Sequence, residues 1–154
     1  MPSDADEGPG GGSRASVPAL LQLVAAARRP QLRAAFDKAG LDGLRPAQAV
    51  GLVPLAAGGL HASDLADVLK VSRQAVAQAV TALEKHGYVR RVPDPDDARA
   101  RIIELTPRGR QALSVMRSSA IDLEAKWERI LGERRLAELR KTLEMLLTAG
   151  ATES

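Results

Sequence analysis

The segment VSRQAVAQAVTALEKHGYVRR, residues 71–91, has the pattern of an amphipathic helix that runs into a basic strand. Ser72 can cap a helix and Gly87 can end one, so we expect a helix from Arg73 to His86. On a helical wheel the polar side chains fall within about 40° of Gln74, and the apolar ones lie on the opposite side. The polar face holds Gln74, Gln78, Thr81 and Lys85, and the apolar face holds Val76, Val80 and Leu83. One face therefore docks on the protein and the other faces outward.

The residues on either side of this helix complete a known motif. Residues 63–70 are predicted to form a short helix with apolar residues inward, joined to the next helix by a tight turn at 71–72. Strands are predicted at 88–92 and 99–105, on either side of a proline-rich loop at 93–97. Two helices joined by a tight turn and followed by a basic hairpin predict a winged helix-turn-helix.

The outward face of the second helix has the chemistry of a DNA-reading surface. Small side chains such as Ala77 let a helix approach the floor of the major groove. The amides of Gln74 and Gln78 can pair with adenine, and alanine can touch the methyl group of thymine. Between residues 68 and 93, five basic residues stand against one acidic residue, a local net charge of +4 in a chain whose net charge is +3. The positive charge therefore gathers where the DNA face is expected.

Further helices are predicted at both ends of the chain. Ser16 can cap a first helix that runs to Ala39, with a kink or break at Pro30. A second, poor helix spans 45–57 and contains Gly51 and Pro54. Thr106-Pro107 starts a helix that Gly132 breaks, and a last helix runs to Gly150. The predicted fold is mainly α with a small β-wing, and the apolar faces of the last two helices exceed what one domain can cover.

Composition excludes several classes of site. The chain has no cysteine, which excludes disulfides, thiolate zinc sites and thiol-based redox sensing. Two histidines, His61 and His86, are too few for a histidine metal site, and both are expected to act as helix caps.

No apolar run approaches the roughly 18 residues that span a bilayer. Residues 1–15 are predicted to be a disordered tail, and the cytoplasm, in association with the nucleoid, is the expected location.

At these residues the sequence resembles the MarR (multiple antibiotic resistance regulator) family of bacterial transcription factors. The resemblance spans about residues 44–113 and includes LHASDLADVLKVSRQAVAQAVTALEKHGYVRR and the wing segment DPDDARARIIELTPRGRQAL. It depends on the combined spacing of Leu65-Ala66, Leu83-Glu84, Gly87-Tyr88-Val89, Asp97-x-Arg99 and Leu105-Thr106-x-x-Gly109. No cofactor is expected.

The resemblance implies a homodimeric regulator, usually a repressor, that binds a palindromic operator. Arg73, Gln74, Ala77 and Gln78 would approach bases, and Ser72 and Thr81 would contact phosphates. Arg99 would reach the minor groove or backbone from the wing, braced by Asp97. The full set of expected DNA-binding residues is Ser72, Arg73, Gln74, Ala77, Gln78, Thr81, Lys85, Arg91, Asp97, Arg99 and Arg101. The expected dimer-interface residues are Leu20, Leu21, Val24, Trp127, Leu136, Leu139, Leu143 and Leu146.

The same resemblance divides the chain into parts with separate roles. Residues 16–43 would form an N-terminal dimerisation helix, 44–110 the DNA-binding domain, and 111–150 the C-terminal dimerisation helices, with a short tail at 151–154. The chain departs from the family pattern at Ala77 and Gln78, where many relatives carry Arg or Thr, and at Ala98, which replaces a frequent wing arginine. Its helix breakers at Pro30, Gly51 and Pro54 interrupt helices that frame the family's effector pocket.

A phenolic or anionic effector is a further implication of the resemblance. Arg28, Arg29 and Arg33 can hold a carboxylate or can simply be solvated, and Trp127 can line a cavity or lie in the dimer core. The alternative function is a winged helix that contacts a protein, although its exposed face would then carry apolar anchors. An enzyme is not expected, because no catalytic triad order, metal-ligand spacing or nucleotide loop is present. Asp94, Asp96 and Asp97 cluster at the hairpin tip, where bracing the wing explains them.

Overall fold

A computed structural model of the chain describes residues 14–152. The elements are α1 (Val17–Lys38), α2 (Pro46–Ala49), the 3₁₀-helix η1 (Val50–Ala56), α3 (Ala62–Leu69), α4 (Arg73–Lys85), β1 (Val89–Pro93), β2 (Arg101–Leu105), α5 (Pro107–Leu131) and α6 (Glu133–Thr152). The predicted class, mainly helical with a small β-wing, is confirmed. Most of the predicted disordered tail at 1–15, and the last two residues of the predicted tail at 151–154, lie outside the described residues.

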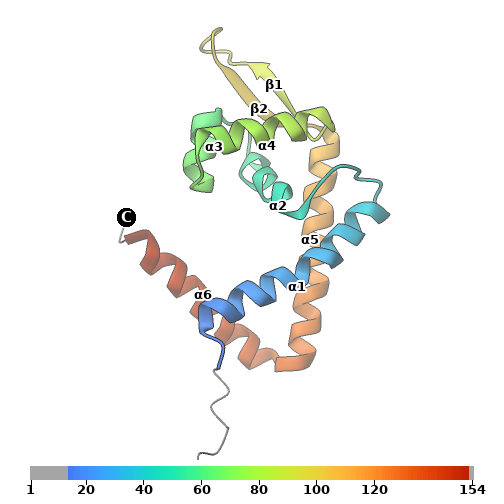
Figure 1. Cartoon of the computed structure of the whole chain (residues 1–154), viewed down its shortest axis with the longest axis vertical. Helices are drawn as coiled ribbons and strands as arrows, with labels where there is room; N and C mark the ends of the chain where they lie inside the picture. The colour runs from blue at the N-terminus through green and yellow to red at the C-terminus, as the bar shows by residue number, and fades with distance from the viewer. Residues whose placement is uncertain (1–13, 153–154) are drawn as a thin grey trace, which may run out of the picture.

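The hydrophobic core lies within one lobe, which holds α2, η1, α3, α4, β1, β2 and the start of α5 (Figure 1). Its largest fully buried side chains include Tyr88, Phe36 and Leu52. Phe36 and Leu32 come from the second half of α1, so that half of the helix belongs to the core of this lobe. The first helix therefore joins the lobe to the helices beyond it.

The remaining helices extend away from this lobe. The long α5 runs out of it, α1 crosses α5, and α6 turns back after Gly132 (Figure 1). The only buried residues of α5 are Gly109 and Ala112, near its start, and α6 has none among its described side chains. These helices nevertheless expose large apolar side chains such as Ile121, Ile130 and Leu147. The apolar surface predicted to exceed the needs of one domain is thus present.

The start of α5 is joined tightly to the end of α4. Thr106 caps α5 by accepting a hydrogen bond from the Gly109 amide at 3.1 Å, and its hydroxyl donates to the carbonyl of Gly87. Gly109 lies so close to β1 that an added Cβ would come within 2.1 Å of the Tyr88 carbonyl oxygen. A glycine is therefore required here, because any side chain would push α5 away from β1.

Of the kink or break expected at Pro30, the break does not occur. Helix α1 continues from Val17 to Lys38 with Pro30 inside it, and Ser16 caps it as predicted. Proline removes one backbone donor, which costs a single helical hydrogen bond. The packing of Leu32 and Phe36 in the core holds the residues after Pro30 in helical geometry.

The second predicted helix is α-helical only at its start. Residues after Ala49 adopt a 3₁₀-helix that includes Gly51 and Pro54. Leu52 and Leu55 are both buried there, and residues three apart lie on the same side of a 3₁₀-helix. The other differences are small: α4 ends at Lys85, and α6 continues past the predicted end at Gly150 to Thr152.

Candidate nucleic-acid interface

The two faces of α4 are arranged as the sequence predicted. The Ser72 hydroxyl accepts a hydrogen bond from the Ala75 amide at 3.1 Å and so caps the helix. Val76, Val80 and Leu83 are buried against the lobe. Every residue of the predicted polar face is exposed, namely Gln74, Gln78, Thr81 and Lys85. Helix α4 therefore presents a continuous polar surface to the outside.

The turn before α4 sets its angle to α3. Lys70 adopts the left-handed backbone conformation, with φ of 53°, directly after the last turn of α3. The Val71 amide donates to the carbonyl of Ala66, which closes the end of α3 in the manner of a helix C-cap. Helices α3 and α4 pack against each other beyond this turn, as a helix-turn-helix requires.

The wing is a two-stranded antiparallel hairpin that projects from the lobe beside α4 (Figure 1). Its register pairs Val89 with Leu105 and Pro93 with Arg101. The Asp97 carboxylate accepts a hydrogen bond from the backbone amide of Arg99 at 2.9 Å, so the predicted bracing acts on the backbone of Arg99. The Arg101 guanidinium donates to the carbonyls of Ala98 and Ala100, which folds the tip onto itself.

The basic strand is coupled to α4 by an ion pair. The Arg91 guanidinium donates to the Glu84 carboxylate at 2.7 Å and lies 3.5 Å from the Thr81 hydroxyl. Arg90, on the other face of the strand, pairs with Glu104 at 2.9 Å. The Arg91 guanidinium is therefore held beside the exposed face of α4.

All of the predicted DNA-binding residues are exposed, and the two elements that carry them, α4 and the wing, lie beside each other (Figure 1). They come from two places: Ser72 to Lys85 from α4 and its cap, and Arg91 to Arg101 from the wing. The sequence did not predict the contact that joins the start of α3 to the wing. His61, expected to cap α3, makes no side-chain cap and instead pairs with Asp94 at 2.9 Å. A signal was available, because histidine stood at a helix start where Ser, Thr, Asp or Asn is preferred.

The other predicted cap, His86, has a different environment. It occupies the C-cap position of α4, and its ring lies over Gly43. A Cβ added to Gly43, which has a φ of 71°, would come within 2.4 Å of this ring. His86 thus packs the turn after α1 against the end of α4.

The predicted dimer-interface residues lie on the helices outside the core. Leu20, Leu21 and Val24 of α1 are between 41% and 49% exposed, and Leu146 of α6 is 56% exposed. Trp127, Leu136 and Leu143 are half-buried. Together these residues form an apolar surface on α1, α5 and α6, and no other part of the described chain covers it.

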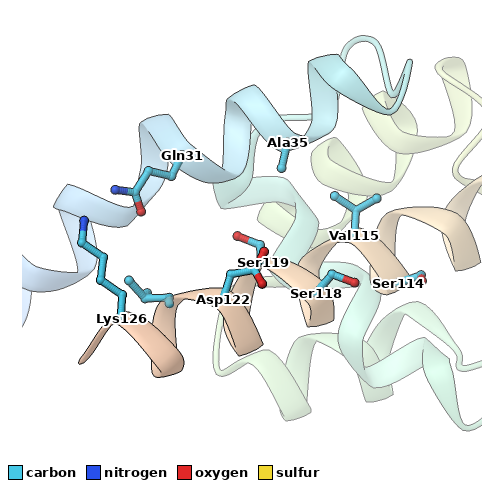
Figure 2. A pocket seen from close by; sticks show the side chains of 9 residues that line it. Gln31, Ala35, Ser114, Val115, Ser118, Ser119, Asp122 and Lys126 are labelled. Carbon is cyan, nitrogen blue, oxygen red and sulfur yellow. The ribbon is translucent and has the colours of Figure 1, made fainter. Parts of the chain in front are cut away.

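Three hollows lie along α1. The largest, of about 430 Å³, separates α1 from α5, and Figure 2 shows Gln31 and Ala35 facing Ser118 and Asp122 across it. A second, of about 270 Å³, is lined by Trp127 and Arg28. A third, of about 220 Å³, lies between α1 and α2 and is lined by Arg28 and Arg29, but not by Arg33. Two of the three candidate anion-binding arginines therefore reach a hollow.

The described residues contain neither a metal-ligand cluster nor a membrane-spanning helix. Within residues 14–152 no three His, Cys, Asp or Glu side chains gather as metal ligands would. None of the described helices is long and apolar enough to cross a membrane.

Comparison with known proteins supports the assignment of the fold. A sequence model of the MarR family matches residues 42–100. The transcriptional activatory protein BadR of Rhodopseudomonas palustris is 34% identical over 94 residues, which are 61% of this chain and 53% of BadR. The match thus spans about half the length of that relative.

Solved structures share the fold over most of the chain. A crystal structure of MarR superposes with a TM-score of 0.76 at 21% identity and covers 92% of this chain and 95% of its own. A mutant of MepR from S. aureus, bound to an oligodeoxyribonucleotide, has a TM-score of 0.57 at 19% identity and covers 88% and 99%. A third structure, described as the MarR family transcription regulator SP03579, has a TM-score of 0.72 at 22% identity and covers 88% of this chain and 86% of its own. Residues 42–100 thus match the MarR family in sequence, and most of the chain shares the fold of MarR.

Proposed function

We propose that the chain is a transcriptional regulator that binds double-stranded DNA in a sequence-specific manner as a homodimer. The observation that carries this proposal is the exposed polar face of α4, capped by Ser72 and set beside a basic wing. A helix of this kind fits the major groove, and a hairpin beside it can follow the adjacent backbone. The MepR relative was solved with an oligodeoxyribonucleotide, which supports the same use of the fold here.

The residues of this face have separate roles in the proposal. Gln74 and Gln78 read base edges through their amides, with Arg73 and Ala77 beside them. Ser72 and Thr81 contact phosphates, and Lys85, Arg91, Arg99 and Arg101 add positive charge along the backbone. Phosphate contacts give affinity, whereas base contacts give the choice of sequence.

A homodimer follows from the apolar surface outside the core. The exposed leucines of α1 and α6 need a cover, and a second copy supplies the same surface in return. Residues 16–43 and 111–150 would then form the dimerisation region and 44–110 the DNA-binding domain. Two-fold symmetry places two copies of α4 one helical turn apart, about 34–36 Å, on a palindromic operator.

Release by a small ligand completes the proposal. The hollow between α1 and α2 combines the guanidinium groups of Arg28 and Arg29 with apolar Leu32, Val50 and Met116. That lining suits a phenolic or other aromatic anion. Because α1 joins the dimerisation helices to the DNA-binding lobe, a ligand there would change the spacing of the two α4 helices. Loss of DNA binding would then relieve repression.

The alternative, a winged helix that only contacts a protein, is less well supported. Hot spots in protein interfaces are enriched in Trp, Tyr and Arg, in well-packed positions. The exposed face of α4 instead presents Gln74, Gln78, Thr81 and Lys85.

Selection of bound duplexes from a random pool tests the proposed function. The purified protein is incubated with the pool at about 150 mM salt, where non-specific binding is weak. An enriched inverted repeat would support a dimeric reader of sequence. A folded dimer that enriches no sequence would contradict the proposal and favour the protein-contact alternative.

A further inference from the structure

His61 makes contacts that its position at the start of α3 does not require. It stands at the N-cap position but makes no capping hydrogen bond to α3. Its ring turns toward the wing, where Nε2 lies 2.9 Å from a carboxylate oxygen of Asp94. Nδ1 lies 3.2 Å from the backbone carbonyl of Arg101. One side chain thus contacts both strands of the wing near the point where they diverge into the tip.

Both partners of the His61 ring are hydrogen-bond acceptors. A neutral imidazole has one N–H donor and one bare nitrogen, so it can satisfy only one of the two acceptors. The imidazolium donates at both nitrogens and satisfies both. When neutral, the ring thus donates either to the Asp94 carboxylate or to the Arg101 carbonyl.

Asp94 connects this contact to the tip of the wing. Its carboxylate is only 11% exposed, and its second oxygen accepts a hydrogen bond from the Asp96 amide at 2.8 Å. Its backbone amide donates to the carbonyl of Ala100 across the loop. The side chain of Asp94 therefore belongs both to the turn of the tip and to the pair with His61.

The contact lies at the boundary between a fixed and a projecting part of the hairpin. Next to His61, Leu60 exchanges two backbone hydrogen bonds with Ile103, of 3.1 and 2.8 Å, which ties the inner part of β2 to the lobe. In the tip, residues 95–100, the amides of Asp96, Arg99 and Ala100 and the carbonyls of Ala98 and Ala100 form hydrogen bonds within the hairpin itself. His61 and Asp94 are the side chains that connect this tip to α3.

We propose that His61 is a positioning residue that holds the tip of the wing, and with it Arg99, at a fixed place relative to α3 and α4. The inference rests on the proposed function, since the position of the wing tip would matter for binding DNA. Because α3 packs on α4, the pair sets the distance between a phosphate contact on the wing and the base contacts on α4. A wing held in advance loses less conformational freedom when it binds.

The test uses substitutions that remove the contact without weakening α3. His61→Ser deletes the ring and introduces a preferred capping hydroxyl, so the thermal midpoint should be unchanged or higher. Asp94→Asn removes the charge on the other partner. Asp96→Asn makes the same chemical change two residues away in the same loop and is the matched control.

The first measurement is hydrogen exchange of the tip amides of Asp96, Arg99 and Ala100 in the full-length protein without DNA. We expect faster exchange in His61→Ser and Asp94→Asn, with no further increase in the double variant, and unchanged exchange in Asp96→Asn. Additive effects, or unchanged exchange in His61→Ser, would overturn the proposal. This measurement gives its answer even if the protein binds no DNA, which would overturn the proposed function separately.

The second measurement is affinity for the duplex that the wild-type protein selects. The two variants should bind about two- to fivefold more weakly, the range expected for a partly exposed charged pair. If exchange at the tip rises but affinity stays the same, His61 holds the wing without positioning it for DNA, and the positioning role is wrong.

Discussion

Arg91 on β1 and Glu84 on α4 form an ion pair of 2.7 Å, which joins the basic strand to the helix that carries the polar face. Both side chains are 38% exposed, so water and salt weaken the pair. Its main consequence is positional, because it holds the Arg91 guanidinium beside the Thr81 hydroxyl. It also means that part of the local positive charge is already neutralised before DNA arrives.

Glu84→Gln should strengthen binding to all duplex sequences. The substitution removes the one acidic residue among residues 68–93 and leaves Arg91 available to a phosphate. The slope of log affinity against log salt should steepen by up to about one unit. Fluorescence anisotropy across a salt series measures both effects. Weaker binding at every salt concentration would mean that Glu84 is needed to place Arg91.

Arg99→Ala should weaken binding by a similar factor on specific and non-specific duplexes. Arg99 is exposed at the wing tip, and we propose that it contacts the DNA backbone, which carries little sequence information. The salt slope should become shallower by about one unit. Arg134→Ala, which removes an exposed arginine from α6, is the control and should change neither quantity. A loss confined to the selected sequence would instead assign Arg99 to a base contact.

Leu21→Asp should convert the proposed dimer into monomers. Leu21 is 41% exposed in the single chain, and in a dimer the new carboxylate would be buried without a partner. An unpaired buried charge costs several kcal/mol, so the dissociation constant should rise by at least about 100-fold. Sedimentation velocity measures the change. Val68→Asp places the same charge on an exposed apolar site of α3 and should leave the oligomeric state unchanged.

Tyr88→Phe should lower the free energy of unfolding by about 1 kcal/mol, the usual contribution of one hydrogen bond. Tyr88 is fully buried, and its hydroxyl donates to the backbone carbonyl of Asp42 at 2.7 Å. The loss would be read from chemical denaturation at neutral pH. An unchanged midpoint would mean that water replaces this hydrogen bond at no cost.

Tyr88 should also make the free energy of unfolding depend on pH in the alkaline range. Burial raises the pKa of the Tyr88 hydroxyl, and the nearby Arg108 guanidinium offsets only part of this rise. The folded state therefore holds the proton more tightly than the unfolded state does. This contribution is fully present below the ordinary pKa of about 10 and is lost as the pH rises through the raised value. Denaturation of Tyr88→Phe across this range should show a smaller loss of stability than the wild type.

The sequence predicted the helices and the hairpin of the winged helix-turn-helix well, because local signals there agree with the packing. Ser72, Thr106 and Ser16 all cap helices as expected, and the two faces of α4 follow a simple helical period. The sequence could not show that Pro30 leaves the helix unbroken, because its effect depends on distant packing. The burial of Phe36 keeps the helix intact, and no local pattern contains that information.

The candidate site was predicted residue by residue but not as a connected structure. Exposure of Gln74 and Gln78 follows from helical periodicity alone. The pairs of His61 with Asp94 and of Arg91 with Glu84 depend on how the hairpin folds back beside α3 and α4, which spacing does not specify. The part that sequence could not supply is therefore the relative placement of the wing and the helix.

The most direct test of the central claim, that α4 reads bases in a two-fold site, is a paired selection with wild-type protein and Gln78→Ala. The account predicts that the wild type enriches an inverted repeat and that the variant loses its preference at one symmetric position in each half-site. Discrimination there should fall by about 1–3 kcal/mol while affinity for unrelated duplex stays the same. Gln22→Ala, an exposed glutamine on α1, is the control and should select the wild-type repeat. An unchanged preference at every position in Gln78→Ala, or an equal loss on all sequences, would contradict the account.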